Sequence, residues 1–226
     1  MSTTIDIFPV ETLDISFGQV LELSQKNLDA FLKSIDINKE VVLEVNLYRN
    51  HGEKIDFQMT DKFEWKDEDD AYEDEENNEY VLFTIKGIVA VAETYMETIY
   101  QDGCMDPWWQ LEDIIKSENK ITDLNSKVKK IKQLNKKWHL RCQWSNPTIM
   151  YVSCGLISAA IAELTSGILY SYDGAWEIDA FPAESKAFLD FYYRKEKAKT
   201  GEYYKRALHS YDAIVEELQE LPDKPL

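Results

Sequence analysis

The first 86 residues combine two periods of hydrophobic and polar positions. Apolar side chains recur at helical spacing over residues 16–35, and a Ser and a Gln three positions apart form a capping-box pattern where that stretch begins. Residues 41–48 alternate strictly instead, as in a strand with one buried face, and residues 55–59 repeat the alternation after a turn. Residues 80–86 (YVLFTIK) have the composition of a further strand. The pattern predicts one amphipathic helix and several antiparallel strands.

From residue 87 onward the apolar positions follow mainly helical spacing. The most hydrophobic stretch, residues 148–166, is followed by Gly167, a residue type that commonly terminates a helix. A short strand over residues 168–172 comes next. The expected helices cover residues 88–100, a segment that starts at Asp106 and Pro107, and residues 121–138, 148–166, 182–194 and 202–221.

These elements define a fold class and a domain organisation. We expect an α+β protein in which an antiparallel sheet, built mainly from the N-terminal half, packs against several helices from the C-terminal half. Residues 1–86 are strand-rich and residues 87–226 are helix-rich, yet no linker rich in Pro, Gly or Ser and no internal repeat separates the two parts. With 44% hydrophobic residues, the 226-residue chain can bury a large core. The sequence therefore predicts a single domain, residues 1–226.

Three features favour a cytoplasmic protein that does not enter a membrane. The first ten residues lack the positive start and apolar stretch of a secretory signal. The longest uncharged run, residues 143–162, is interrupted by Asn146 and Pro147, and its apolar part is shorter than the ~20 residues of a membrane-spanning helix. The three cysteines are widely spaced and odd in number, which predicts reduced thiols rather than a disulfide framework.

Negative charge is concentrated in one segment. Residues 61–80 (DKFEWKDEDDAYEDEENNEY) hold eleven carboxylates and two lysines, and so contribute −9 of the formal net charge of −17. A field of that sign repels nucleic acid and anionic lipid and attracts basic protein surfaces. Because the segment falls between two predicted strands, we expect an acidic loop. It can be a solvated loop or a loop that binds a partner; a calcium-binding EF-hand loop would need a glycine that this segment lacks.

One basic surface is predicted on the helix at residues 121–138. A lysine-rich face of this kind can contact the phosphates of a nucleic acid. The net charge of −17 opposes such contact, so we expect a solvated helix face and no nucleic-acid partner. The face consists of Lys129, Lys130, Lys132, Lys136 and Lys137.

Metal and cofactor signals are weak. The chain has no glycine pattern that cradles phosphates, no HExxH and no GxSxG. His139 and Cys142 are three positions apart and could bind zinc together with Cys104, Cys154 or His209. Structural zinc sites normally use two close pairs of ligands, and only one pair is present here. We therefore interpret these residues as parts of the core and expect no cofactor.

Carboxylates near Trp176 provide a catalytic alternative. General acid–base catalysis needs two carboxylates that are held in a cleft with different pKa values. Glu163, Asp173, Glu177 and Asp179 offer such a pair. A small carboxylate-dependent hydrolase with a site around residues 163–179 is thus an alternative function.

The segment from 159 to 193, AAIAELTSGILYSYDGAWEIDAFPAESKAFLDFYY, carries a family resemblance. It has a helix of small residues that ends in an AELTxG-like phrase, an apolar strand, a short acidic turn and a helix with the pattern P-A-x-x-x-x-F-L. In this it resembles the C-terminal region of bacterial immunity-type proteins, which accompany polymorphic or contact-delivered toxins. The resemblance covers 35 of the 226 residues. It implies that the segment is a scaffold, and it assigns no binding residue.

The acidic segment and the resemblance together suggest a function. We expect a non-catalytic intracellular binding protein, similar to an immunity protein or inhibitor, that neutralises a basic protein such as a toxin by occlusion. Aromatic anchors among carboxylates can slow the dissociation of such a complex. The expected contact residues are Trp65, Asp67, Glu68, Asp69, Asp70, Tyr72, Glu73, Asp74, Glu75 and Glu76.

Overall fold

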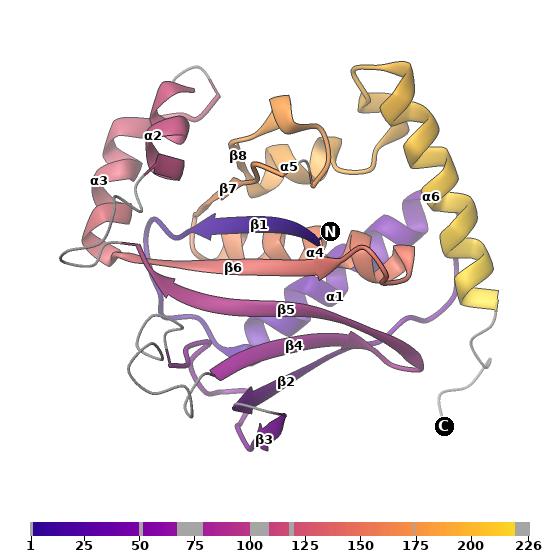
Figure 1. The fold of residues 1–226 in the computed structure, drawn as a ribbon, viewed down its shortest axis with the longest axis horizontal. Helices are drawn as coiled ribbons and strands as arrows, with labels where there is room; N and C mark the ends of the chain where they lie inside the picture. The colour runs from indigo at the N-terminus through magenta and orange to yellow at the C-terminus, as the bar shows by residue number, and fades with distance from the viewer. Residues whose placement is uncertain are drawn as a thin grey trace.

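The computed structural model describes residues 2–49, 52–66, 79–99, 109–117, 120–173 and 175–219. The strands form one antiparallel eight-stranded sheet with the order β3-β2-β4-β5-β6-β1-β7-β8 (Figure 1). Together with the helices, this sheet confirms the predicted α+β class. Most of the strands lie in the N-terminal half, also as predicted.

The N-terminal half supplies five strands and β6 to β8 come from the C-terminal half. In the sheet β1 lies between β6 and β7, so the first strand of the chain pairs with two of the last. The strands are β1 (Ser2–Phe8), β2 (Leu43–Arg49), β3 (Glu53–Ile55), β4 (Glu79–Ile85), β5 (Ile88–Thr98), β6 (Lys136–Gln143), β7 (Ile168–Tyr170) and β8 (Ala183–Glu184).

The helices agree with the predicted periodicity at most positions. The expected helix at residues 16–35 forms with its capping box, in which Ser16 and Gln19 exchange hydrogen bonds. Two short 3₁₀ helices, η2 (Ile178–Ala180) and η3 (Lys195–Lys197), flank α5. The α-helices are α1 (Phe17–Ser34), α2 (Trp109–Lys116), α3 (Leu124–Leu134), α4 (Thr148–Leu164), α5 (Ser185–Phe191) and α6 (Gly201–Gln219).

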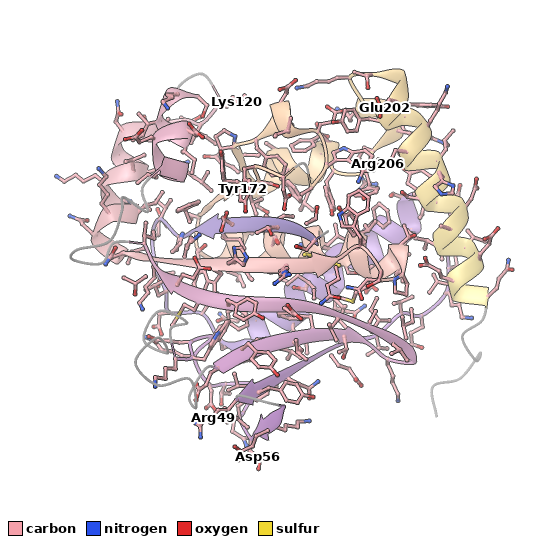
Figure 2. All side chains as sticks on the ribbon, viewed as in Figure 1. Arg49, Asp56, Lys120, Tyr172, Glu202 and Arg206 are labelled. Atoms are coloured by element: carbon pink, nitrogen blue, oxygen red, sulfur yellow. The ribbon has the colours of Figure 1, made fainter. Side chains whose placement is uncertain are left out.

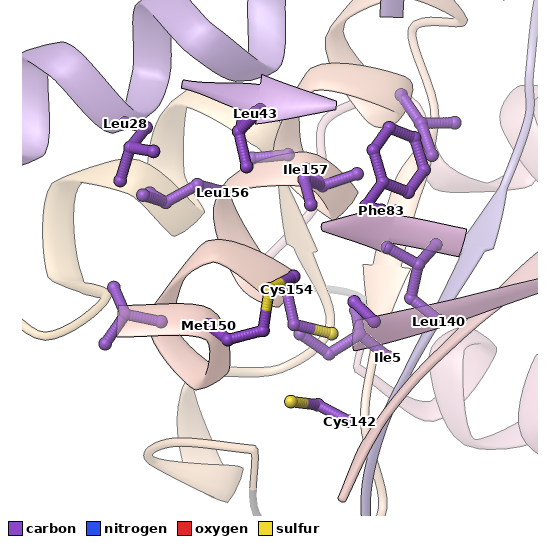
Figure 3. Packing of buried hydrophobic residues seen from close by; sticks show 14 of the residues in the cluster. Ile5, Leu28, Leu43, Phe83, Leu140, Cys142, Met150, Cys154, Leu156 and Ile157 are labelled. Carbon is purple, nitrogen blue, oxygen red and sulfur yellow. The ribbon is translucent and has the colours of Figure 1, made fainter. Parts of the chain in front are cut away.

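Helix α4 lies at the centre of the molecule. Thirteen of its seventeen residues are buried, because it packs against β1, β5 and β6 on one side and against α1, α5 and α6 on the others. Figure 3 shows Leu156 and Ile157 of α4 between Leu28 of α1 and Phe83 of β4. A helix that is apolar on all sides requires such cover. Helices α1 and α4 therefore occupy one face of the sheet, behind it in Figure 1.

The first turn of α4 is capped by a residue from α6. Its preceding residue is Pro147, whose side chain makes no capping hydrogen bond. The carboxylate of Glu217 instead accepts hydrogen bonds from the backbone N–H groups of Thr148, at 2.6 Å, and Ile149, at 2.9 Å. A carboxylate at this position satisfies two unpaired donors and interacts favourably with the helix dipole. The contact ties α6 to the start of α4.

A second hydrophobic cluster lies on the opposite face of the sheet. Helices α2 and α3 pack there over Phe8 of β1 and over Ile168 and Tyr170 of β7. From the helices and the segment between them, the cluster includes Leu111, Ile114, Ile121, Leu124, Val128 and Ile131. In Figure 1 this pair of helices lies beside the β1 and β7 end of the sheet, and none of the helices that the structure describes covers the near face of β4, β5 and β6.

The predicted helix at residues 88–100 is wrong, because β5 occupies this segment. Gly87, with φ +83°, forms a tight turn that sends the chain back along β4. The side chains alternate along β5: Ala92 and Met96 join the core beneath α4, and Tyr95 points to the other face. The apolar positions of this segment fit the period of a helix and also that of a strand. The β-branched residues Val and Thr at the other positions favour a strand.

Two further differences concern the neighbouring strands β1 and β6. Residues 2–8 form β1, a strand that was not among the predicted elements. The expected helix at 121–138 ends at Leu134, where Asn135 adopts a left-handed conformation with φ +51°, and β6 begins at Lys136. The predicted lysine face is therefore divided. Lys129, Lys130 and Lys132 lie on α3, and Lys137 is buried in β6.

The close packing of α4 generates a stability prediction. A Cβ atom on Gly155 would lie 2.3 Å from Cζ of Tyr192, whose ring is buried. We expect Gly155→Ala to lower the free energy of unfolding by about 2 kcal/mol or more, because the added methyl group would overlap this buried ring. Urea denaturation followed by circular dichroism measures the change.

Gly201→Ala is the matched control. The added Cβ has no neighbour within 4 Å at this first residue of α6, so stability should stay equal or rise slightly. Equal stability of wild type and Gly155→Ala would contradict the described packing of α4.

Candidate functional site

A row of polar and aromatic side chains crosses the face of the sheet that α1 and α4 leave uncovered. Each residue of the row comes from a different strand, and the strand register places them next to one another. In the order of the strands β2, β4, β5, β6, β1 and β7, this polar row consists of Tyr48, Tyr80, Tyr95, His139, Asp6 and Tyr170.

Aromatic contacts form one half of the polar row. The rings of Tyr48 and Tyr80 are stacked, with centroids 5.9 Å apart and an interplanar angle of 19°. Tyr80 lies 6.2 Å from Tyr95, which lies 6.3 Å from the ring of His139. The Tyr95 hydroxyl donates a hydrogen bond of 3.3 Å to Glu93 on the same strand. Cross-strand aromatic neighbours of this kind stabilise a sheet and hold the rings in fixed positions.

A buried ion cluster forms the other half of the polar row. The side chain of Asp6 is fully buried, and its Oδ1 lies 2.9 Å from Nζ of Lys137 and 3.1 Å from Nδ1 of His139. Lys137 also pairs with Glu97, at 2.9 Å. A charge in the interior needs such partners, because the loss of hydration is otherwise very costly. The cluster therefore fixes the relative positions of β1, β5 and β6.

The environment shifts the pKa values of this cluster in opposite directions. Burial alone would raise the pKa of Asp6, but the hydrogen bond with His139 and the charge of Lys137 outweigh it, so the pKa lies below its ordinary value. Burial would lower the pKa of Lys137, and Asp6 and Glu97 raise it above the ordinary value. Both groups are therefore charged at neutral pH. Since Asp6 is held by Lys137 and His139, it is a structural charge rather than a free general base.

Tyr170 closes the row at the second hydrophobic cluster. Its hydroxyl donates a hydrogen bond of 3.1 Å to Asp113 on α2. Burial, together with this hydrogen bond, raises the pKa of Tyr170 to about 12. The phenol is therefore neutral in the physiological range and links α2 to the sheet.

The described ends of the acidic segment meet beside the polar row. Glu79, the first residue of β4 and the neighbour of Tyr80, receives a salt bridge of 2.7 Å from Arg49 of β2. Its other carboxylate oxygen accepts a hydrogen bond of 3.1 Å from the backbone N–H of Lys66. Figure 2 shows Arg49 at the end of β2. Lys66 and Glu79, the described residues on either side of 67–78, are thus held together at one point of the sheet.

The expected contact residues fall into two groups. Trp65 is only 5% exposed and packs against Phe63, with ring centroids 4.9 Å apart, and against Phe17, at 6.3 Å. It therefore belongs to the core and not to an exposed contact surface. The predicted contact residues Asp67, Glu68, Asp69, Asp70, Tyr72, Glu73, Asp74, Glu75 and Glu76 lie outside the described residues.

The four carboxylates of the alternative hydrolase site have different surroundings. Glu163 lines a pocket beside Ser166 and Gly167. Asp173 is hydrogen-bonded to Ser171, at 3.1 Å. Burial raises the pKa of Asp173.

Glu177 and Asp179 line a separate pocket, and one Glu177 oxygen accepts a hydrogen bond from the backbone N–H of Lys199. Of the four carboxylates, Glu177 and Asp179 thus line one pocket together.

The proposed zinc ligands do not converge. His139 points to the polar face of β6, whereas Cys142, three residues later, points to the opposite face, towards Cys154 of α4 (Figure 3). An odd separation along a strand places two side chains on opposite faces. His209 lies on α6, and Cys104 is outside the described residues. Within the part of the chain that the structure describes, no three His, Cys, Asp or Glu side chains are placed to bind a metal.

The hydrophobic pattern of the sequence predicts few members of the polar row. The alternation Thr4–Phe8 with a charged residue between Ile5 and Ile7 was the available signal for Asp6.

None of the helices in the described ranges has the length and hydropathy that a membrane crossing requires. Comparisons with protein-family models, with curated proteins and with solved structures found no match for this chain.

The ion cluster generates a stability prediction. Asp6→Asn removes one partner of a buried ion pair, so the free energy of unfolding at pH 7 should fall by about 3 kcal/mol. Replacing both partners, in Asp6→Asn with Lys137→Met, should recover part of this loss. The exposed control Asp212→Asn should change stability by less than about 0.5 kcal/mol.

The effect of Asp6→Asn on stability also depends on pH. Because the pKa of Asp6 is lowered in the folded protein, its contribution is present above the ordinary pKa of 3.8 and is lost as the pH falls through the folded-state pKa. The difference in stability between wild type and Asp6→Asn should therefore shrink below about pH 4. Urea denaturation at several pH values measures it, and a difference that stays constant down to pH 2.5 would contradict the ion pairs.

Proposed function

We propose that this protein is a non-catalytic binding protein that captures a basic protein partner. The acidic segment at residues 61–80 and the adjoining tyrosines of the polar row would form the contact surface. The observation that carries the proposal is the junction at Glu79, where the acidic segment enters β4 directly beside Tyr80. Charge and aromatic side chains, which serve different steps of association, therefore meet at one place.

The charge of the segment favours fast association with a basic surface. Residues 67–78 contain eight carboxylates and no basic residue, and so contribute −8 of the net charge of −17. Opposite charge on two partners raises association rates by about 10-fold to 1000-fold at low ionic strength. At physiological salt the screening length is about 8 Å, so the effect depends on carboxylates that come close to the partner.

The tyrosines contribute binding energy rather than fast association. Tyr48, Tyr80 and Tyr95 project from neighbouring strands and are held by ring contacts of 5.9 and 6.2 Å. Tyrosines that are already ordered lose little conformational entropy on binding, and tyrosine is enriched among residues that dominate interface energies. These tyrosines take over the anchoring role expected for Trp65, which is buried.

The mechanism of such a protein is occlusion. A partner such as a toxin with a positively charged active site would lose access to its substrate while the acidic surface covers it. The resemblance of residues 159–193 to bacterial immunity-type proteins supports this context. In the structure that segment includes β7, η2, β8 and α5. Of these elements, β7, β8 and α5 contribute buried side chains to the hydrophobic clusters, which supports the interpretation of the segment as a scaffold.

The charge prediction uses two variants with the same net charge. The first replaces Asp67, Glu68, Asp69 and Asp70 by their amides, and the second replaces Glu22, Glu202, Asp212 and Glu216, which are exposed on α1 and α6. Each changes the formal charge from −17 to −13. We expect the first variant to associate with the partner about 10-fold more slowly at low salt, and the second to behave nearly like wild type.

The partner is first captured from the source cell on immobilised wild-type protein and eluted with a salt gradient, and surface plasmon resonance then gives the rates. Equal association rates for the two four-residue variants would refute the acidic segment as the contact site. Recovery of acidic proteins alone would refute a basic partner.

A separate prediction concerns the tyrosines. Tyr95→Ala should accelerate dissociation of the captured partner by about 10-fold or more, with a smaller change in association rate. Tyr204→Ala, an exposed tyrosine on α6, is the control and should leave both rates unchanged. Thermal unfolding of each variant verifies that the fold is retained. Unchanged dissociation of Tyr95→Ala would remove the sheet face from the proposed surface.

A further inference from the structure

Two cysteine side chains meet in the core between β6 and α4. Cys142 of β6 and Cys154 of α4 are both fully buried, and both are free thiols. Figure 3 shows their side chains in the space between the strand and the helix. Helix α4 packs directly on β6, with Cα atoms of the two elements within 8 Å of each other. The thiols therefore lie where a short covalent bridge could join the two elements.

The sulfur of Cys142 is in contact with an amide group. It accepts a hydrogen bond of 3.2 Å from Nδ2 of Asn146, which also donates a hydrogen bond of 2.7 Å to the carbonyl oxygen of Val91. Hydrogen bonds from the Cys154 thiol and from Asn146 lower the pKa of Cys142 below its ordinary value, although burial opposes this change. Because the thiolate is the nucleophilic form of cysteine, these contacts make Cys142 the more reactive of the two thiols.

Cys154 has the opposite surroundings. Its thiol donates a hydrogen bond to Cys142, and this hydrogen bond, together with burial, raises the pKa of Cys154 above its ordinary value. A thiol that readily loses its proton thus has a protonated thiol as its neighbour. This is the arrangement in which one sulfur is oxidised first and the second sulfur then reacts with it.

The turn after β6 gives access to Cys142. Asn146, which contacts the sulfur, is itself partly exposed, and Trp144 in the same turn is 60% exposed. A single layer of side chains thus separates the Cys142 sulfur from solvent. A small oxidant needs a local opening of this turn and not the unfolding of the core.

We propose that Cys142 and Cys154 form an oxidation site at which hydrogen peroxide produces an intramolecular disulfide. The Cys142 thiolate attacks one oxygen of the peroxide: an S–O bond forms, the O–O bond breaks, and hydroxide leaves. The Cys154 sulfur then attacks the Cys142 sulfur, so that the S–S bond forms, the S–O bond breaks, and the departing hydroxide takes the proton of Cys154. The two thiols lose two electrons, and one peroxide molecule becomes two water molecules.

The disulfide would tie β6 to α4 inside the core. Because a cross-link restricts the unfolded chain, the oxidised protein should unfold at a higher temperature than the reduced protein, by about 5 °C. The site is independent of the surface proposed for the protein partner, since neither cysteine belongs to the polar row or to the acidic segment.

Mass spectrometry of the full-length protein tests the proposal. No Lys or Arg lies between the two cysteines, so trypsin releases both on one peptide, residues 142–186. After treatment with about 1 mM hydrogen peroxide at about pH 7.5, this peptide should be lighter by about 2 Da. It should react with iodoacetamide only after reduction with dithiothreitol.

Two variants with the same change in charge test the order of the reaction. Asn146→Asp keeps the size of the side chain but replaces the N–H donor by a charged oxygen, so it should slow disulfide formation by about 10-fold. Gln143→Glu, at an exposed neighbour of Cys142, is the control and should react at nearly the wild-type rate. Thermal unfolding verifies that both variants fold. Equal rates would refute Cys142 as the thiolate that reacts first.

Cysteine variants identify the two sulfurs. Cys104→Ser should form the disulfide at the wild-type rate. Cys154→Ala should show no loss of 2 Da, and its Cys142 should instead become a sulfenic acid that dimedone traps. The proposal is overturned if peptide 142–186 keeps both thiols reduced after peroxide treatment, or if either of its cysteines is found linked to Cys104 of the same or another chain.

Discussion

The burial of α4 on all sides is the constraint on which the rest of the structure depends. Thirteen of its seventeen residues are buried, and no polar face is left for solvent. The sheet covers one side, and α1, α5 and α6 must cover the others. The close approach at Gly155 and the cap from Glu217 follow from this arrangement, because a helix in the centre needs close-packed neighbours and partners for its end.

This arrangement uses one face of the sheet for the core and leaves part of the other face for polar groups. On that face Asp6 pairs with Lys137 and His139, so the central strands also carry a buried ion cluster. Such a cluster adds less net stability than apolar packing of the same volume would. Its consequence here is positional: it fixes the strand register, and the register determines which side chains of the polar row are neighbours.

The sequence predicts the parts of the fold that depend on local patterns. Periodicity over residues 16–35 and 148–166 is strong, so α1 and α4 were predicted correctly. The spacing of apolar positions in β5 fits both a helix and a strand; the β-branched residues favour the strand, and the pairing with β4 and β6 forms it. The candidate site was less predictable. Asp6 and its partners are more than 130 residues apart. Trp65 lies within the acidic segment yet is buried, in contact with Phe17, which is distant in sequence.

The position of the acidic segment determines what its charge can accomplish. A run of carboxylates on an unattached tail would attract basic proteins of many kinds, because long-range attraction carries little structural information. Here both described ends of the run are held through Glu79, between Arg49 and Lys66. A partner drawn to the charge would therefore arrive beside an ordered row of tyrosines, where shape and contact area discriminate between basic surfaces. The proximity of the acidic segment to the tyrosines, more than the charge itself, makes selective binding physically reasonable.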